Sequence, residues 1–119
     1  MNVAERVTIA IVGAGPYGLA LAHELSRRGE SPLVLGRPMD TWSKHMPRGM
    51  FLKSEGRASS IIASDESLTL GRYCAETGAE YADVGTPVPL ETFVSYGRWF
   101  RGKAVPQLVE ADVTELREN

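Results

Sequence analysis

Hydrophobic positions near the start of the chain follow the order strand, helix, strand. Residues 7–12 form a mostly β-branched apolar run that ends at a glycine, which is typical of a strand buried on both faces of a parallel sheet. From residue 18 to 28, leucine and alanine recur at helical spacing, and Gly29 follows as a residue that ends helices. A second short apolar run covers residues 33–35. The pattern predicts one βαβ unit with a right-handed crossover.

The middle of the chain has weaker patterns. Residues 37–50 have no clear period and contain two prolines, so we expect a long ordered loop there. A short strand is expected over residues 50–52, and the polar residues 54–67 predict a further loop.

Three more elements are predicted in the second half of the chain. The pattern over residues 68–77 predicts a short helix that ends at Gly78. Residues 89–101 carry apolar positions at intervals of three and four, with Pro89 at the first helical position, which predicts a second helix. Apolar and polar residues alternate from 109 to 114, as they do in a half-buried strand.

Composition and charge narrow the class of protein. At 119 residues and 13.0 kDa, the chain has the size of one domain and leaves no room for a second. Hydrophobic residues make up 43% and charged residues 24%, as in an ordinary globular protein. A net charge of -2 gives no basic field, so nucleic acid is not expected as a partner. The apolar start is interrupted by glycines and is too short to span a bilayer, so no membrane partner is expected.

The reactive side chains are few. A single cysteine, Cys74, cannot close an intramolecular disulfide, which favours a reducing cytoplasm as the location. Its place on a predicted helix indicates a buried small hydrophobe rather than a nucleophile. His23 and His45 have no partners at zinc-binding spacing, so no metal site is predicted.

The motif that carries chemistry lies between the first strand and the first helix. Residues 13–18 have the spacing G-x-G-x-x-G of a dinucleotide-binding turn. Gly13 permits the tight turn, Gly15 lets a pyrophosphate approach the backbone, and Gly18 lets the helix pack closely on the strand. The free N–H groups at the start of the helix then face the phosphates. An ordinary glycine turn that binds no nucleotide is the alternative.

One part of the usual dinucleotide site is missing. An acidic residue normally follows the second strand and binds the adenosine ribose, but this chain has Gly36 and Arg37 there. Asp40 comes too late to replace it. The ribose is therefore held by the backbone, or Arg37 lies over the adenine or faces a phosphate. A solvated Arg37 without any role is the remaining alternative.

Several segments together resemble a known family. Residues 13–18, the segment 36–54 with Trp42, and residues 87–96 are similar to the N-terminal part of FAD-dependent class B flavoprotein monooxygenases. The nearest branch resembles the bacterial urate-hydroxylase-like and lysine/ornithine N-hydroxylase-like members. Because the segment 42–54 is more specific than the glycine motif, the resemblance favours FAD over NAD. It implies an α/β fold over residues 1–119, of the three-layer Rossmann-type FAD/NAD(P)-binding class with an incomplete parallel sheet.

The resemblance also implies a set of FAD-binding residues, although it assigns no catalytic residue. They come from the glycine turn, the loop after the second strand and the last strand: Gly13, Gly15, Pro16, Tyr17, Gly18, Arg37, Trp42, Met50, Lys53 and Val113. Trp42 and Met50 offer polarizable apolar contact to a flat ring, and Lys53 could stabilise negative charge on the reduced flavin. The alternatives are a Trp42 that belongs to the core and a Lys53 that is a surface cation.

The resemblance further implies a larger enzyme. Its members have a second glycine motif for NADPH and a late strand beside the first one, and neither occurs in this sequence. We therefore expect a truncated, N-terminal FAD-binding portion whose sheet is completed by a missing C-terminal part or a second chain. The complete enzyme would be an NAD(P)H-dependent monooxygenase that hydroxylates a small nitrogenous or aromatic substrate, and this chain alone is not expected to be active. The alternatives are a stand-alone nucleotide-binding module and a non-catalytic remnant that acts as an interaction surface.

Overall fold

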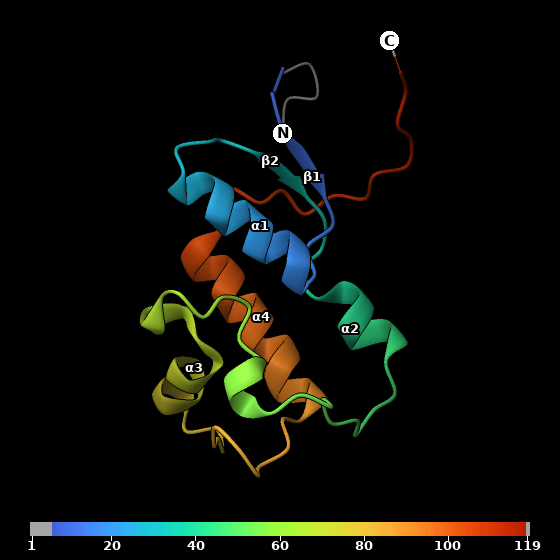
Figure 1. The fold of residues 1–119 in the computed structure, drawn as a ribbon. Helices are drawn as coiled ribbons and strands as arrows, with labels where there is room; N and C mark the ends of the chain where they lie inside the picture. Colours follow the sequence, from blue (N-terminus) through green and yellow to red (C-terminus); the bar gives the residue numbers. More distant parts are fainter. Residues whose placement is uncertain (1–5, 119) are drawn as a thin grey trace.

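A small parallel sheet lies at one end of the fold, with the helices on one side of it (Figure 1). The computed structural model describes residues 6–118. Strands β1 (Ala10–Val12) and β2 (Leu33–Leu35) pair in parallel and are joined by helix α1 (Pro16–Arg27). The predicted βαβ unit and its parallel pairing are therefore confirmed.

The ends of α1 follow from its sequence. The helix begins at Pro16, two residues earlier than predicted, because proline has no N–H to lose in the first turn. At the other end, Arg27 and Arg28 both pair with Glu24, at 2.7 and 3.1 Å. Gly29 then takes a left-handed conformation with φ of 90°, as predicted.

Strand β1 is shorter and less buried than predicted. Ile11 and its partner Val34 are buried on the face that α1 covers. Val12 points to the opposite face and is 54% exposed. The prediction that this strand is buried on both faces is therefore wrong, because the described residues place their helices on the α1 side of the sheet (Figure 1). Of the three layers expected for this fold class, residues 6–118 contain the sheet and one helical layer.

The predicted last strand is reduced to a single bridge. Val109 pairs in parallel with Leu35, on the edge of β2 opposite to β1. The N–H of Val109 donates to the carbonyl of Val34 at 2.9 Å, and the N–H of Gly36 donates to the carbonyl of Val109 at 3.2 Å. Val113 lies beyond this bridge, half-buried and outside any described strand.

A short helix occupies part of the segment predicted as a loop. Helix α2 (Asp40–His45) follows Met39, which is fully buried and has φ of 60°. An ion pair of 3.1 Å between Asp40 and Lys44 supports this helix. Its pattern is hard to detect in the sequence because none of its residues is buried. The predicted strand at 50–52 is also reduced, to one antiparallel bridge between Phe51 and Pro89.

Two predicted helices are confirmed in the second half. Helix α3 (Leu70–Thr77) ends at Gly78, whose φ is 79°, and helix α4 (Leu90–Ala104) is three residues longer than expected at its C-terminal end. The polar segment before α3 contains two short 3-10 helices, η1 (Gly56–Ala58) and η2 (Glu66–Leu68).

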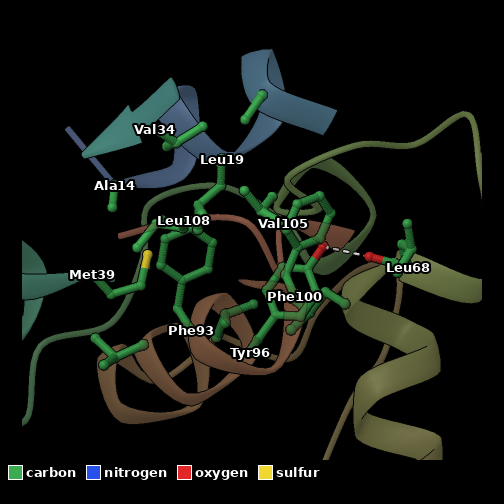
Figure 2. Packing of buried hydrophobic residues seen from close by; sticks show 14 of the residues in the cluster. Ala14, Leu19, Val34, Met39, Leu68, Phe93, Tyr96, Phe100, Val105 and Leu108 are labelled. Atoms are coloured by element: carbon green, nitrogen blue, oxygen red, sulfur yellow. Dashed lines mark hydrogen bonds between the residues drawn. The ribbon is translucent and has the colours of Figure 1, made fainter. Parts of the chain in front are cut away.

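Helix α4 lies at the centre of the hydrophobic core. It contacts α1, α2 and α3, and its fully buried Tyr96 and Phe100 side chains belong to the same hydrophobic cluster as Leu19 of α1 (Figure 2). At Gly97 a Cβ atom would overlap the buried side chain of Met39, so this glycine lets the start of α2 pack against α4. No helix within residues 6–118 is both long and apolar enough to cross a membrane.

The contact between α1 and the glycine turn generates the first testable prediction. A Cβ atom at Gly18 would overlap the carbonyl oxygen of Gly13, so Gly18→Ala should lower the free energy of unfolding by about 1–3 kcal/mol. In the matched control Gly102→Ala, on α4, the new methyl group meets no atom within 4 Å. That variant should be as stable as the natural chain or more stable by about 0.5–1 kcal/mol. Urea unfolding measures both; an unchanged Gly18→Ala would show that α1 can move away from the turn.

Candidate functional site

The glycine turn is held against both strands and the helix, and one side of it stays open. The N–H of Gly13 donates to the carbonyl of Leu35 at 2.8 Å, which ties the turn to β2. Gly18 is in close contact with the turn from the α1 side. At Gly15, by contrast, a Cβ atom would have Trp42 Nε1 as its nearest neighbour, 4.0 Å away. Gly15 therefore faces open space in front of the first turn of α1, where the helix has free N–H groups.

The end of β2 packs directly on the same turn. A Cβ atom at Gly36 would lie 2.9 Å from the nitrogen of Ala14 and 3.1 Å from the carbonyl carbon of Gly13. The N–H of Met39 also donates to the carbonyl of Ala14, at 3.0 Å. These contacts are the physical reason why position 36 carries no acidic side chain in this chain.

A cleft of about 400 Å³ opens in front of the turn, and we call it the glycine cleft. It is lined by residues 12–18, Gly36, Arg37, residues 40–42 and Asp112. The structure thus brings the predicted glycines together with Pro16, Tyr17, Arg37 and Trp42. Their contact with FAD stays a prediction.

A second cleft of about 590 Å³, which we call the apolar cleft, adjoins the first. Its lining comes from α1, the segment after α2, and α4: Pro16, Tyr17, Ala20, Trp42, residues 50–54, residues 58–61 and Phe93. Pro16, Tyr17 and Trp42 line both clefts, so the two lie side by side. Met50 and Lys53 lie here, and Lys53 is the one charged residue in the lining. Val113 lines neither cleft.

Trp42 belongs both to the core and to the clefts. Its ring lies 5.0 Å from that of buried Phe93, with an angle of 59° between the planes. The residue remains half-buried and forms part of both cleft walls. Tyr17, which is 91% exposed, stands at the mouth of both clefts.

Tyr96 holds one wall of the apolar cleft in place. Its hydroxyl donates to the carbonyl of Leu68 at 2.8 Å (Figure 2) and accepts from the N–H of Ile61 at 2.9 Å. Burial raises the pKa of Tyr96 to about 12. The segment 58–61 has no strand or long helix of its own, so this buried hydroxyl fixes it to α4. No pattern in the sequence indicates this task of Tyr96.

Asp112 is a residue of the glycine cleft that the sequence analysis missed. Its Oδ1 accepts from Nε of Arg37 at 3.2 Å, and the side chains are 74% and 44% exposed, respectively. The carboxylate holds the pKa of Arg37 above its usual range. No local pattern could connect Arg37 with a partner so distant in the chain.

Two reactive side chains lie away from the clefts. Cys74 is buried on α3, and burial raises the pKa of its thiol, in agreement with the prediction of a small hydrophobe. His45 is exposed at the end of α2 and lines neither cleft.

Comparison with known proteins identifies the class. Residues 6–56 match the family described as FAD binding domain. No curated protein matches the chain. Among solved structures, the lysine monooxygenase NbtG from Nocardia farcinica has a TM-score of 0.69 and 20% identity, over 93% of this chain and 37% of that one. The bacillithiol disulfide reductase Bdr from Staphylococcus aureus has a TM-score of 0.64 and 19% identity, over 89% and 28%. A steroid monooxygenase bound to NADP has a TM-score of 0.65 and 14% identity, over 87% and 19%.

These matches establish the fold and the cofactor. The chain has a Rossmann-type fold like that of these flavoproteins, and residues 6–56 match the FAD binding domain. By its sequence, the chain resembles the N-terminal part of flavoprotein monooxygenases. The family match and the similar folds confirm this resemblance. The chain spans between 19% and 37% of the length of these three structures.

The Tyr96 contacts generate a prediction about stability and pH. Tyr96→Phe keeps the ring but removes the hydroxyl from two buried backbone groups, so the free energy of unfolding at neutral pH should fall by about 1–3 kcal/mol. The folded-state pKa of about 12 lies above the usual 10.0, so the hydroxyl's contribution is complete below pH 10.0 and is lost as the pH rises toward 12.

The measurement is urea unfolding of the natural chain and Tyr96→Phe across this pH range, and the difference between them should shrink above pH 10.0. The control Tyr17→Phe, at an exposed position, should change the stability little. A difference for Tyr96→Phe that stays constant with pH would contradict the burial argument.

Proposed function

We propose that the two clefts together form the FAD site of this chain. The glycine cleft takes the pyrophosphate and adenosine, and the apolar cleft takes the flat isoalloxazine ring. The observation that carries this proposal is that the two clefts adjoin, since Pro16, Tyr17 and Trp42 line both of them. A polar, glycine-lined part joined to an apolar part matches the two chemically different halves of FAD.

The residues present fit each half of the cofactor. The open face of Gly15 leaves the backbone accessible to a pyrophosphate, and the first turn of α1 directs its N–H groups and positive dipole end there. In the apolar cleft, Trp42 and Met50 offer polarizable surface to the ring system. FAD supplies two-electron redox chemistry when bound. Lys53 would offset negative charge that forms on the reduced ring.

We further propose that this chain is the FAD-binding part of an NAD(P)H-dependent monooxygenase that hydroxylates a small nitrogenous or aromatic substrate. The family match and the likeness to a lysine monooxygenase and a steroid monooxygenase support this proposal. The printed sequence has one glycine motif, so we expect this chain to bind the cofactor and not to complete the reaction alone. The single buried cysteine supports a location in the reducing cytoplasm.

The open edge of β1 supports a proposal about the rest of the sheet. Among residues 6–118, β1 pairs with β2 alone. In this register the N–H and C=O groups of Ile11 face β2, whereas those of Val12 point to the opposite edge. We propose that a strand from a further part of the same polypeptide pairs with this edge, since the similar structures have much longer chains.

Hydrogen exchange of single amides tests this proposal. In the 119-residue chain, the amide of Val12 should exchange much faster than that of Ile11, because only Ile11 donates to β2. The comparison is repeated at increasing protein concentration. Protection of Val12 in dilute protein would contradict the open edge, and protection that appears with concentration would show a second copy pairing there instead.

FAD binding itself is tested by fluorescence titration of the natural chain and Gly15→Ala. Gly15 has φ of -79°, and a Cβ atom there has no neighbour closer than 4.0 Å, so alanine should leave the fold intact. The methyl group should weaken FAD binding by about 1–3 kcal/mol, because it stands where the pyrophosphate meets the backbone. Gly102→Ala serves as the control and should bind FAD normally.

Competition with ADP and FMN then separates the candidate functions. A flavin site requires FAD to bind more tightly than ADP, because the apolar cleft contributes contacts to the ring. Equal affinities for FAD and ADP would indicate a nucleotide-binding module without a flavin site. An unchanged dissociation constant in a correctly folded Gly15→Ala would show that the phosphates bind elsewhere.

A further inference from the structure

We propose that Asp112 is the acidic residue that binds the ribose hydroxyls of the adenosine half, and that Arg37 positions its carboxylate. The inference rests on the proposed FAD site. It assigns to the C-terminal segment a task that the residue after the second strand performs in the usual dinucleotide site.

The usual position cannot carry this acid here. A Cβ atom at Gly36 would lie 2.9 Å from the nitrogen of Ala14. The N–H of Met39 also donates to the carbonyl of Ala14, at 3.0 Å. The main chain after β2 therefore runs too close to the glycine turn for a carboxylate to fit between them. Asp40 also lines this cleft, but its carboxylate pairs with Lys44 at 3.1 Å. Asp112, from the C-terminal segment, is the other acid in the lining.

The C-terminal segment reaches this end of the cleft because it is tied to β2. Val109 exchanges two backbone hydrogen bonds with β2 and Gly36. Three residues later, Asp112 lines the glycine cleft, next to Gly36 and Arg37. Glu110, which directly follows Val109, has its Oε2 atom 4.0 Å from Nη2 of Arg101 and does not line this cleft. Of these two acids of the C-terminal segment, Asp112 lines the cleft that Gly36 also lines, and Glu110 does not.

The geometry of the ion pair leaves Asp112 free to bind a second partner. Arg37 donates through Nε to Oδ1 at 3.2 Å, and the carboxylate remains 74% exposed. An ionised carboxylate has two acceptor oxygens with about four lone pairs, so one arginine does not saturate it. Arg37 restricts the orientation of the carboxylate, and the remaining oxygen can accept from hydroxyl groups.

The pair would contribute little as a purely structural link. Exposed ion pairs add little to the stability of a protein, so removal of Asp112 should leave the chain folded. A role in binding therefore predicts an effect that a structural role does not: loss of discrimination between ligands with and without ribose hydroxyls.

The experiment measures competition with FAD by ADP and by 2′,3′-dideoxy-ADP. The natural chain should bind ADP about 10-fold more tightly or better, because the dideoxy ligand leaves the carboxylate without its hydroxyl partners. In Asp112→Ala this preference should fall close to one. The matched control Glu110→Ala loses the same charge from the same segment and should keep the preference. In Arg37→Ala the preference should fall partway, since the carboxylate loses its positioning partner but remains present.

Each failure has its own signature. If FAD binds but ADP and dideoxy-ADP compete equally in the natural chain, no carboxylate binds the ribose and the inference is wrong. A preference that survives in a folded Asp112→Ala also overturns it and leaves the Arg37 pair as a surface link. If the natural chain binds neither FAD nor ADP, the proposed FAD site itself is wrong.

Discussion

The central constraint in this fold is the space around the glycine turn. Helix α1 approaches it at Gly18 and the end of β2 approaches it at Gly36, and neither contact leaves room for a Cβ atom. This close packing directs the first turn of α1 and the open side of Gly15 into the same cleft. It also keeps an acidic side chain out of position 36. The same steric constraint therefore creates the phosphate-binding surface and removes the usual ribose ligand.

Helix α4 provides the second support of the site. Its Gly97 accepts the side chain of Met39, so the start of α2 is anchored beside the glycine turn. Its Tyr96 holds the irregular segment around Ile61 that walls the apolar cleft. Much of the cleft lining lies in segments without long helices or strands. Such segments keep a defined shape only when buried groups on a rigid element satisfy their backbone hydrogen bonds.

The elements that could be predicted are those whose signals are local. The βαβ unit follows from an apolar run, a glycine turn and a helical period within a short stretch, and α4 up to about residue 101 follows from its apolar spacing. The short helix at 40–45 was not predicted, because it buries none of its residues and starts after Met39, which has a left-handed conformation. The exposure of Val12 was not predicted, because a β-branched run has the same sequence pattern whether or not a second layer of helices covers the strand.

The sequence by itself determined the class of the protein: the spacing of residues 13–18 and the segment around Trp42 indicate FAD, and the match of residues 6–56 agrees. Only the tertiary structure decided which distant residues share the site. It joined the loop after β2 to the apolar cleft and placed Asp112 beside Arg37. The physical reason is that a motif acts through neighbours along the chain, whereas Asp112 reaches Arg37 because Val109 forms a bridge with Leu35. The alternation over residues 109–114 predicts a strand but does not show which strand it pairs with.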